Sequence, residues 1–167
     1  MALEIRPVLP EEHEEAGRVA ALAYREFVGA DDGAWREYLQ HIADVEGRVG
    51  SATVLVAVEN GLILGSATLE LDGRIDDDDP PLHPDEAHIR MLGVDPQARG
   101  RGIARALMDA CFALSRKAGR TYVTLHTTER MKGAQAMYRS LGFERLGDRV
   151  FPDGFVLLTY RKAIPPP

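Results

Sequence analysis

The spacing of apolar and polar residues predicts alternating strands and helices along the chain. Residues 3–8 alternate between the two kinds before Pro10, which predicts a short edge strand. A first helix is predicted by apolar residues that follow the helical period, at positions 16, 19, 20, 23, 24 and 27. A second, shorter helix over 35–45 is predicted by the apolar positions 35, 38, 39 and 42. Residues 53–58 and 62–71 are β-rich runs on either side of Asn60-Gly61, a pair typical of a hairpin turn.

The second half of the chain continues this pattern. An acidic, proline-rich loop around 76–81 leads into an apolar strand over 87–94. A helical stripe at positions 103, 107, 111, 114 and 118 stops at Gly119, and residues 122–126 predict a strand. Thr127 or Thr128 is expected to cap a helix that runs to Ser140, and residues 143–146 and 154–161 predict a final antiparallel pair.

Length, charge and cysteine content narrow the class of protein. The 167 residues suffice for one core, so we expect a single domain over 1–167. The net charge of −6 argues against nucleic-acid binding. The one cysteine, Cys111, lies on the helical stripe and is expected in the core. We expect no metal site, because the spacing of His83, His88 and His126 is not that of metal ligands. No signal pattern or spanning apolar run is present, which predicts a cytoplasmic protein without a membrane partner.

The junction at 89–111 is the most informative stretch, because a strand there ends in a glycine-rich turn that opens a helix. Such a turn directs unpaired backbone N–H groups and the helix dipole at one point. Gly100 and Gly102 allow close approach of a ligand, and Arg99, Arg101 and Arg105 add positive charge. The junction therefore predicts a phosphate or pyrophosphate site, with an empty strand-to-helix turn as the alternative.

Two other nucleotide motifs do not fit this turn. A P-loop requires Lys-Ser/Thr after its last glycine, where this chain has Ile103-Ala104. A dinucleotide fingerprint requires a third glycine, where this chain has Arg105. What remains is Gln97-x-x-Gly100-x-Gly102, preceded by Leu-Gly-Val-Asp-Pro.

This pattern resembles the acetyl-CoA-binding motif of the GCN5-related N-acetyltransferase (GNAT) superfamily. A second segment, from Ala134 through Tyr138 to Gly142-Phe143, resembles the family's A-x-x-x-Y-x-x-x-G-F motif. The resemblance covers about residues 3–162. It implies an α/β GNAT fold, in which helices flank both faces of a single mixed, mostly antiparallel sheet.

The resemblance also implies roles for individual residues. The Leu92 and Val94 backbones are expected to hold pantetheine and the acetyl carbonyl, with a backbone N–H near Leu92 as oxyanion donor and Gly93 at a bulge that opens the sheet. Tyr138 is expected to protonate the departing thiolate. The pyrophosphate is assigned to Gln97, Ala98, Arg99, Gly100, Arg101, Gly102, Ile103 and Ala104, and the remaining cofactor contacts to Met131, Ala134 and Tyr138.

The general base has several candidates. His88 occupies a strand position at which family members often carry a glutamate, and imidazole suits proton transfer near neutral pH. A partly buried strand histidine without a catalytic role is the alternative, and Glu70 and His126 are lesser candidates. Met131 stands where many relatives have an asparagine, so a hydrogen bond to the pantetheine arm is missing or comes from elsewhere.

Together these features predict an enzyme that transfers an acetyl group from acetyl-CoA to a primary amine by direct attack in a ternary complex. The acceptor is a small-molecule or peptide amine, bound by the variable regions 27–45, 76–79 and 149–155. The acidic run 76–79 is either a solvated loop or an attraction for cationic acceptors. The alternative function is a non-catalytic CoA-binding sensor or interaction module. For the oligomeric state, the predicted edge strands are compatible with a homodimer.

Overall fold

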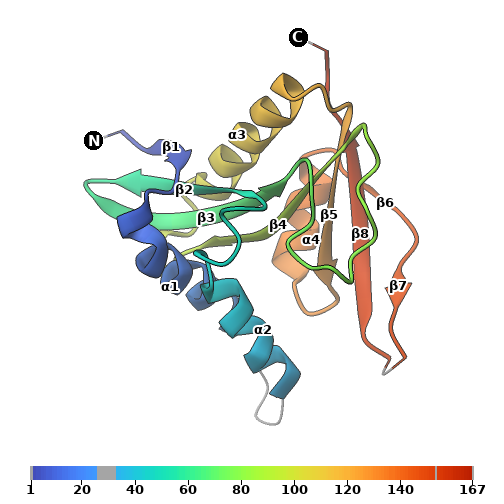
Figure 1. The fold of residues 1–167 in the computed structure, drawn as a ribbon, viewed down its shortest axis with the longest axis horizontal. Helices are drawn as coiled ribbons and strands as arrows, with labels where there is room; N and C mark the ends of the chain where they lie inside the picture. The colour runs from blue at the N-terminus through green and yellow to red at the C-terminus, as the bar shows by residue number, and fades with distance from the viewer. Residues whose placement is uncertain (1, 26–32, 153, 167) are drawn as a thin grey trace.

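One eight-stranded sheet organises the part of the chain that the structure describes (Figure 1). The structure is a computed structural model that describes residues 2–25, 33–152 and 154–166. The strands are β1 (Glu4–Pro7), β2 (Thr53–Glu59), β3 (Leu62–Glu70), β4 (Glu86–Val94), β5 (Tyr122–Thr128), β6 (Glu144–Arg145), β7 (Arg149–Val150) and β8 (Val156–Ala163). The α-helices are α1 (His13–Tyr24), α2 (Gly33–Ala43), α3 (Ile103–Lys117) and α4 (Lys132–Ser140), with 3₁₀ turns η1 (Pro10–Glu12) and η3 (Pro96–Ala98).

The strand order β1-β2-β3-β4-β5-β8-β6 is antiparallel except at its centre, where β4 and β5 run parallel, and β7 pairs with β8. The parallel ladder covers four residue pairs, from Glu86 with Tyr122 to Ile89 with Leu125. Both strands continue beyond it, β4 to Val94 and β5 to Thr128. In Figure 1 the strands on the two sides of this junction fan apart. The mixed, mostly antiparallel sheet is therefore confirmed.

Helices cover both faces of the sheet because the central strands are apolar on both sides. On β2, Leu55 and Ala57 pack into the cluster beneath α3, whereas Val54 and Val56 pack into the cluster beneath α1. Helix α2 packs against α1, with Trp35 and Ile42 buried between them. This arrangement places the junction at 89–111 at the centre of the fold.

Two local predictions are confirmed by backbone geometry. Asn60 and Gly61 both have positive φ, 54° and 76°, as a tight hairpin turn between β2 and β3 requires. Gly119 has φ 81° directly after α3, which matches its predicted role as the helix terminator. Phe27, predicted on the first helix, lies outside the described residues.

Two other predictions are corrected. The helix of Tyr138 begins at Lys132, with Met131 at its N-cap, so Thr127 and Thr128 do not cap it. Both threonines instead extend β5, because they pair with Leu158 and Leu157 of β8. The C-terminal region contains β6 and β7 in place of the one strand predicted before β8, and each pairs separately with β8.

Candidate functional site

A cleft of about 690 Å³ lies beside the end of β4 that extends past its ladder with β5. The C-terminal turn of α1, the turn before α3 and the first turns of α4 complete its walls. Its predicted lining residues are Leu92, Gly93, Val94, Ala98, Arg99, Gly100, Gly102, Ile103, Ala104, Met131 and Ala134. Arg105, predicted to add positive charge to the phosphate site, also lines the cleft, and the lining residues that were not predicted are Ala23, Tyr24, Arg130, Lys132, Gly133 and Met137.

The turn before α3 has the backbone of an anion-binding loop. Gly100 and Gly102 have φ of 81° and 79°, which side chains with a Cβ rarely adopt. Gly102 is the N-cap of α3 and has no side chain to bond the first N–H groups of the helix. These donors and the positive end of the helix dipole therefore meet at the cleft.

Positive side chains line the cleft in an otherwise acidic protein. Arg99, Arg105, Arg130 and Lys132 contribute to the wall, and none of its described lining residues is acidic. Apolar side chains, among them Leu92 and Met137, form another part of the wall. A ligand with several negative charges on one part and a neutral chain on the other fits this distribution.

Gln97 and Arg101 do not belong to the described cleft lining, although the sequence predicted both at the pyrophosphate. The backbone N–H of Gln97 donates to Asp95 Oδ1 at 2.9 Å, a turn that closes β4. The half-exposed Arg101 forms an ion pair with Glu59 at the end of β2. Arg99 reaches across the cleft, and its Nη2 donates to the carbonyl of Ala23 at 3.3 Å.

Strand β4 bulges beside the cleft. Ser66 and Thr68 of β3 pair with Gly93 and Arg90, so β4 carries one residue more than β3 over this interval. Met91, not Gly93, is the bulge residue with positive φ, at 55°. Gly93 is required for a different reason: an added Cβ would lie 2.7 Å from the Cβ of Ala23 on α1.

Helix α1 also holds the bulge through a hydrogen bond. The Tyr24 hydroxyl donates to the carbonyl oxygen of Leu92 at 2.8 Å, across 68 residues of sequence. Burial, followed by the proximity of Tyr138, raises the pKa of Tyr24 well above its ordinary value. Tyr24 therefore remains a protonated donor at physiological pH.

Tyr138 lies behind the cleft wall rather than on it. Its ring packs 5.8 Å from Phe143 and 5.7 Å from Tyr160, between centroids. Burial, with a smaller contribution from Tyr160, raises the pKa of its hydroxyl, which keeps the proton on the oxygen. The structure thus places Tyr138 next to the predicted cofactor residues, with its ring in the core.

His88 lies on β4 before the bulge, 2 % exposed, and does not line the cleft. Its Nδ1 is 2.8 Å from Thr124 Oγ1, and the Thr124 hydroxyl is 2.5 Å from Glu86 Oε2. The ring of the partly exposed His126 lies 4.9 Å away, and His126 Nδ1 is 3.1 Å from Thr159 Oγ1. Burial, and then the proximity of His126, lowers the pKa of His88, so the ring is neutral at pH 7.

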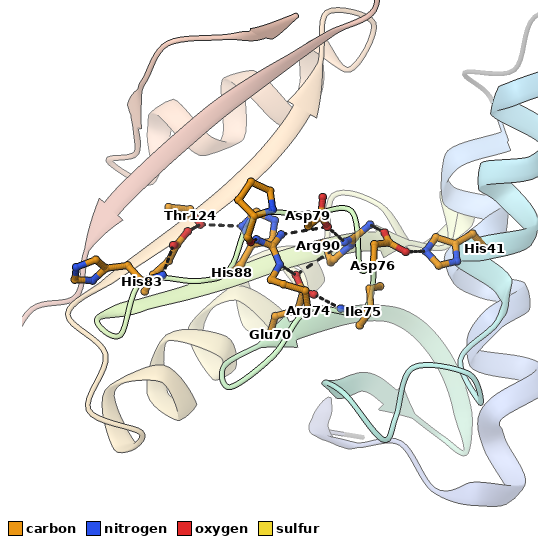
Figure 2. A network of polar contacts seen from close by, with 12 residues as sticks. His41, Glu70, Arg74, Ile75, Asp76, Asp79, His83, His88, Arg90 and Thr124 are labelled. Carbon is orange, nitrogen blue, oxygen red and sulfur yellow. Dashed lines mark hydrogen bonds and ion pairs between the residues drawn. The ribbon is translucent and has the colours of Figure 1, made fainter. Parts of the chain in front are cut away.

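Arginines pair with Asp76 and Asp79 of the acidic loop, whereas Asp77 and Asp78 are exposed, so the expectation of a solvated run holds only for the middle of the loop (Figure 2). Arg90 bonds Asp76 at 2.8 Å and Asp79 at 2.9 Å, and Arg74 bonds the buried Glu70 at 3.2 Å. We call these five residues the loop network. Because Asp76 and Asp79 already face arginines, their charges are largely neutralised. Glu70, a lesser candidate for the base, belongs to this network rather than to the cleft.

His41 on α2 extends the loop network, since its Nε2 lies 2.9 Å from Asp76. Burial raises the pKa of the Glu70 carboxyl despite the nearby arginines.

Other polar groups are accounted for more simply. Cys111 is buried on α3, as predicted, and burial raises its pKa to about 12, which keeps the thiol protonated. Over residues 2–25, 33–152 and 154–166, no cluster of three or more His, Cys, Asp or Glu side chains is arranged to hold a metal ion. Within the same ranges, no helix combines the length and apolar character needed to cross a membrane.

The residues that the sequence did not reveal reach the cleft from distant segments. Ala23 and Tyr24 come from α1, and no local motif marks them. Arg130 and Lys132 directly flank Met131, so the charge around that predicted position was the available signal. Thr124 could be found only from the register between β4 and β5.

Comparisons with known proteins agree with this geometry. Residues 17–143 match the model of the acetyltransferase (GNAT) family. N-alpha-acetyltransferase RimI of Mycobacterium tuberculosis is 31% identical over 135 residues, which cover 81% of this chain and 76% of that protein. A probable N-acetyltransferase family 8 member 5 of Mus musculus is 35% identical over 92 residues, 55% of this chain. That match spans only 38% of the mouse protein's length.

The fold has counterparts among solved structures. The PaiA N-acetyltransferase of Thermoplasma acidophilum, crystallised with coenzyme A, superposes with a TM-score of 0.73 at 15% identity. The superposition covers 97% of this chain and all of that one (100%). The residues that match the family model include β4, the glycine turn before α3 and the helix of Tyr138, around which the cleft is built. The chain therefore belongs to the GNAT family of acetyltransferases.

Proposed function

We propose that this protein transfers an acetyl group from acetyl-CoA to a primary amine by direct attack in a ternary complex. The observation that carries the proposal is the cleft beside the bulge of β4, with its left-handed glycines, its cationic wall and its apolar wall. Coenzyme A combines a pyrophosphate and a phosphate monoester with an uncharged pantetheine arm. Family members crystallised with coenzyme A support this choice of ligand.

The pyrophosphate is assigned to the backbone N–H groups of the turn from Arg99 to Ala104, where the dipole of α3 adds positive potential. The pantetheine arm is assigned to the apolar wall and the exposed edge of β4 at Leu92 and Val94. Met131 lines the cleft without offering a side-chain donor, so in this part of the site the arm is held by apolar contact and by backbone groups.

The amine must lose a proton before it attacks the thioester carbonyl. Its nitrogen then bonds to the carbonyl carbon, the C–S bond breaks and the thiolate takes up a proton. We assign the oxyanion to a backbone N–H at the bulge near Leu92 and the thiolate proton to Tyr138. The amine proton is assigned to the pair formed by His88 and His126, with the partly exposed His126 nearer the surface.

The acceptor that we propose to test first is the α-amino group of a peptide. RimI, which the chain matches over most of both sequences, is an N-alpha-acetyltransferase. Asp76 and Asp79 already form ion pairs with Arg90, so the acidic loop gives little support to the idea that the protein selects polycationic amines. Small-molecule amines form the comparison group of the same experiment.

Two measurements test this proposal. Calorimetry with acetyl-CoA, CoA, ATP and NAD should give micromolar affinity for the first two ligands alone. A ligand that binds should also raise the Tm of the protein, and the increase should grow with the ratio of ligand concentration to Kd. A thiol-release assay with pooled peptides and amines should then liberate CoA. The proposal fails if acetyl-CoA does not bind the folded protein.

A non-catalytic CoA-binding module remains the second candidate. It is favoured by one observation, namely that neither Tyr138 nor His88 lines the described cleft. Micromolar acetyl-CoA binding without thiol release from any peptide or amine would select this function over catalysis.

A further inference from the structure

A carboxylate, a hydroxyl and an imidazole form a connected chain across the parallel strands, outside the cleft. Glu86 and His88 lie on the same side of β4, two residues apart, and Thr124 is the register partner of His88 on β5. The contacts are 2.5 Å from Thr124 Oγ1 to Glu86 Oε2 and 2.8 Å from Thr124 Oγ1 to His88 Nδ1. Figure 2 shows Thr124 beside the His88 ring.

The hydrogen-bonding capacity of these groups determines which atom carries each proton. An ionised carboxylate only accepts hydrogen bonds, and Glu86 also accepts the backbone N–H of His83 on its other oxygen, at 3.1 Å. The single proton of the Thr124 hydroxyl is therefore donated to Glu86. Thr124 Oγ1 can then only accept from His88, so Nδ1 of the neutral ring carries the proton and Nε2 holds the lone pair.

We propose that Glu86 and Thr124 are positioning residues that hold neutral His88 in its Nδ1–H tautomer, so that Nε2 accepts the proton lost by the acceptor amine. This inference rests on the proposed acetyl transfer. The proton leaves the ammonium group and ends on Nε2 of His88, which becomes an imidazolium. The partly exposed His126, whose ring centroid lies 4.9 Å from that of His88, marks the side from which the proton arrives. The amine keeps the lone pair that attacks the thioester, and Glu86 offsets the new positive charge through Thr124.

The surroundings of His88 explain why such a counter-charge matters. Arg74 from the acidic loop, Arg90 from β4 and His126 from β5 all disfavour a proton on this ring. Glu70 of β3, its register partner, is engaged by Arg74 and by the Ile75 N–H. Glu86 is thus the carboxylate that hydrogen bonds connect to His88.

The first test reads the tautomer directly and needs neither acetyl-CoA nor acceptor. Nitrogen-15 NMR of the imidazole groups, with His88 assigned by its loss in His88→Gln, should show a protonated Nδ1 and an unprotonated Nε2 at pH 7. In Thr124→Val the Nδ1–H preference should disappear, and Thr124→Ser should restore it. A protonated Nε2 in the wild-type protein would overturn the inference.

The second test separates positioning from structural support. Thr124→Val should lower kcat about tenfold or more with unchanged acetyl-CoA affinity, and Thr124→Ser should recover most of the rate. Glu86→Gln should move the acidic limb of the kcat/KM profile to lower pH, because His88 then binds a proton less tightly. Thr127→Val is the matched control, since Thr127 is buried on the same strand but its hydroxyl has no hydrogen-bond partner among the described residues.

The two possible failures are distinguishable. A wild-type protein that releases CoA while Thr124→Val keeps its full kcat and pH profile would refute the positioning role and leave the proposed function intact. A wild-type protein that binds acetyl-CoA but releases no CoA with any amine would refute both catalytic statements, whatever the tautomer.

Discussion

The cleft and the loop network differ in how they hold charge. In the cleft, arginine and lysine side chains line an accessible wall without acidic neighbours among the described lining residues, and backbone N–H groups of a single turn add to the positive potential. In the loop network, Glu70 is buried, the other four charged groups are partly buried, and each of the five faces an opposite charge. The first arrangement gathers charge of one sign around a cleft that can hold a ligand, whereas the second pairs opposite charges and so fixes a loop on the sheet.

This difference also separates two kinds of sensitivity. The cleft depends on backbone conformation at a few consecutive residues and should respond to changes in φ. The buried groups Glu70 and His88, whose pKa values are shifted by burial, should respond to pH. The following predictions test this division, beginning with the largest expected effect.

Tyr138→Phe is expected to lower kcat about a hundredfold, because it removes the group assigned to protonate the thiolate while leaving the ring in its aromatic cluster. The Kd for acetyl-CoA should change little, as calorimetry can show. Tyr160→Phe, a change of the same kind in the same cluster, is the control and should keep the rate. An unchanged kcat in Tyr138→Phe would remove Tyr138 from the mechanism and leave the thiolate proton to another donor.

Gly102→Val should weaken acetyl-CoA binding about tenfold, because a side chain at φ 79° costs on the order of 1–2 kcal/mol and shifts the turn. Gly73→Val is the control: an added Cβ meets no atom within 4 Å at either position, but only Gly102 has a left-handed φ. Equal affinities of the two variants in calorimetry would show that backbone conformation at the turn does not set binding.

His88→Gln should flatten the dependence of stability on pH below about 6.5. Burial lowers the folded-state pKa of His88, so between that value and the unfolded pKa the unfolded chain binds the extra proton. Wild-type stability should therefore fall as the pH decreases, by up to about 1.4 kcal/mol per pH unit from this group. Urea unfolding at pH 5, 6 and 7 measures how the free energy of unfolding changes with pH. The same change in the wild-type protein and in His88→Gln would show that protonation of His88 does not affect stability.

Lys132→Ala should weaken acetyl-CoA binding only about two- to fivefold at low salt, since an exposed cation contributes at most about 1 kcal/mol. The effect should shrink further at 0.5 M salt because charges at the cleft are then screened. Lys117→Ala, at the far end of α3, is the matched control. Equal losses in the two variants would mean that the cationic wall acts through overall charge alone.

The sequence predicted the cleft better than the loop network for a physical reason. The turn and helix at 97–104 are contiguous, and glycine conformation, helix dipole and charge can be read there without knowing the rest of the fold. The contact between Tyr24 and Leu92 joins residues far apart in sequence, and the pairs of Arg90 depend on the path of the acidic loop. Thr127 illustrates the same limit, because its pairing in β5 prevailed over its tendency to cap a helix.

The bulge of β4 has a consequence for insertions and deletions. Before it, Ile89 packs beneath α3 while His88 faces the opposite side; after it, Val94 packs beneath α3 while Gly93 lies against Ala23 of α1. The extra residue thus exchanges odd and even positions between the two sides of the strand. Deleting Met91 would restore the unbroken alternation of side chains along β4. Every later side chain of the strand would then point to the other face of the sheet. Loss of a single codon there should therefore be more damaging than most substitutions at the same place.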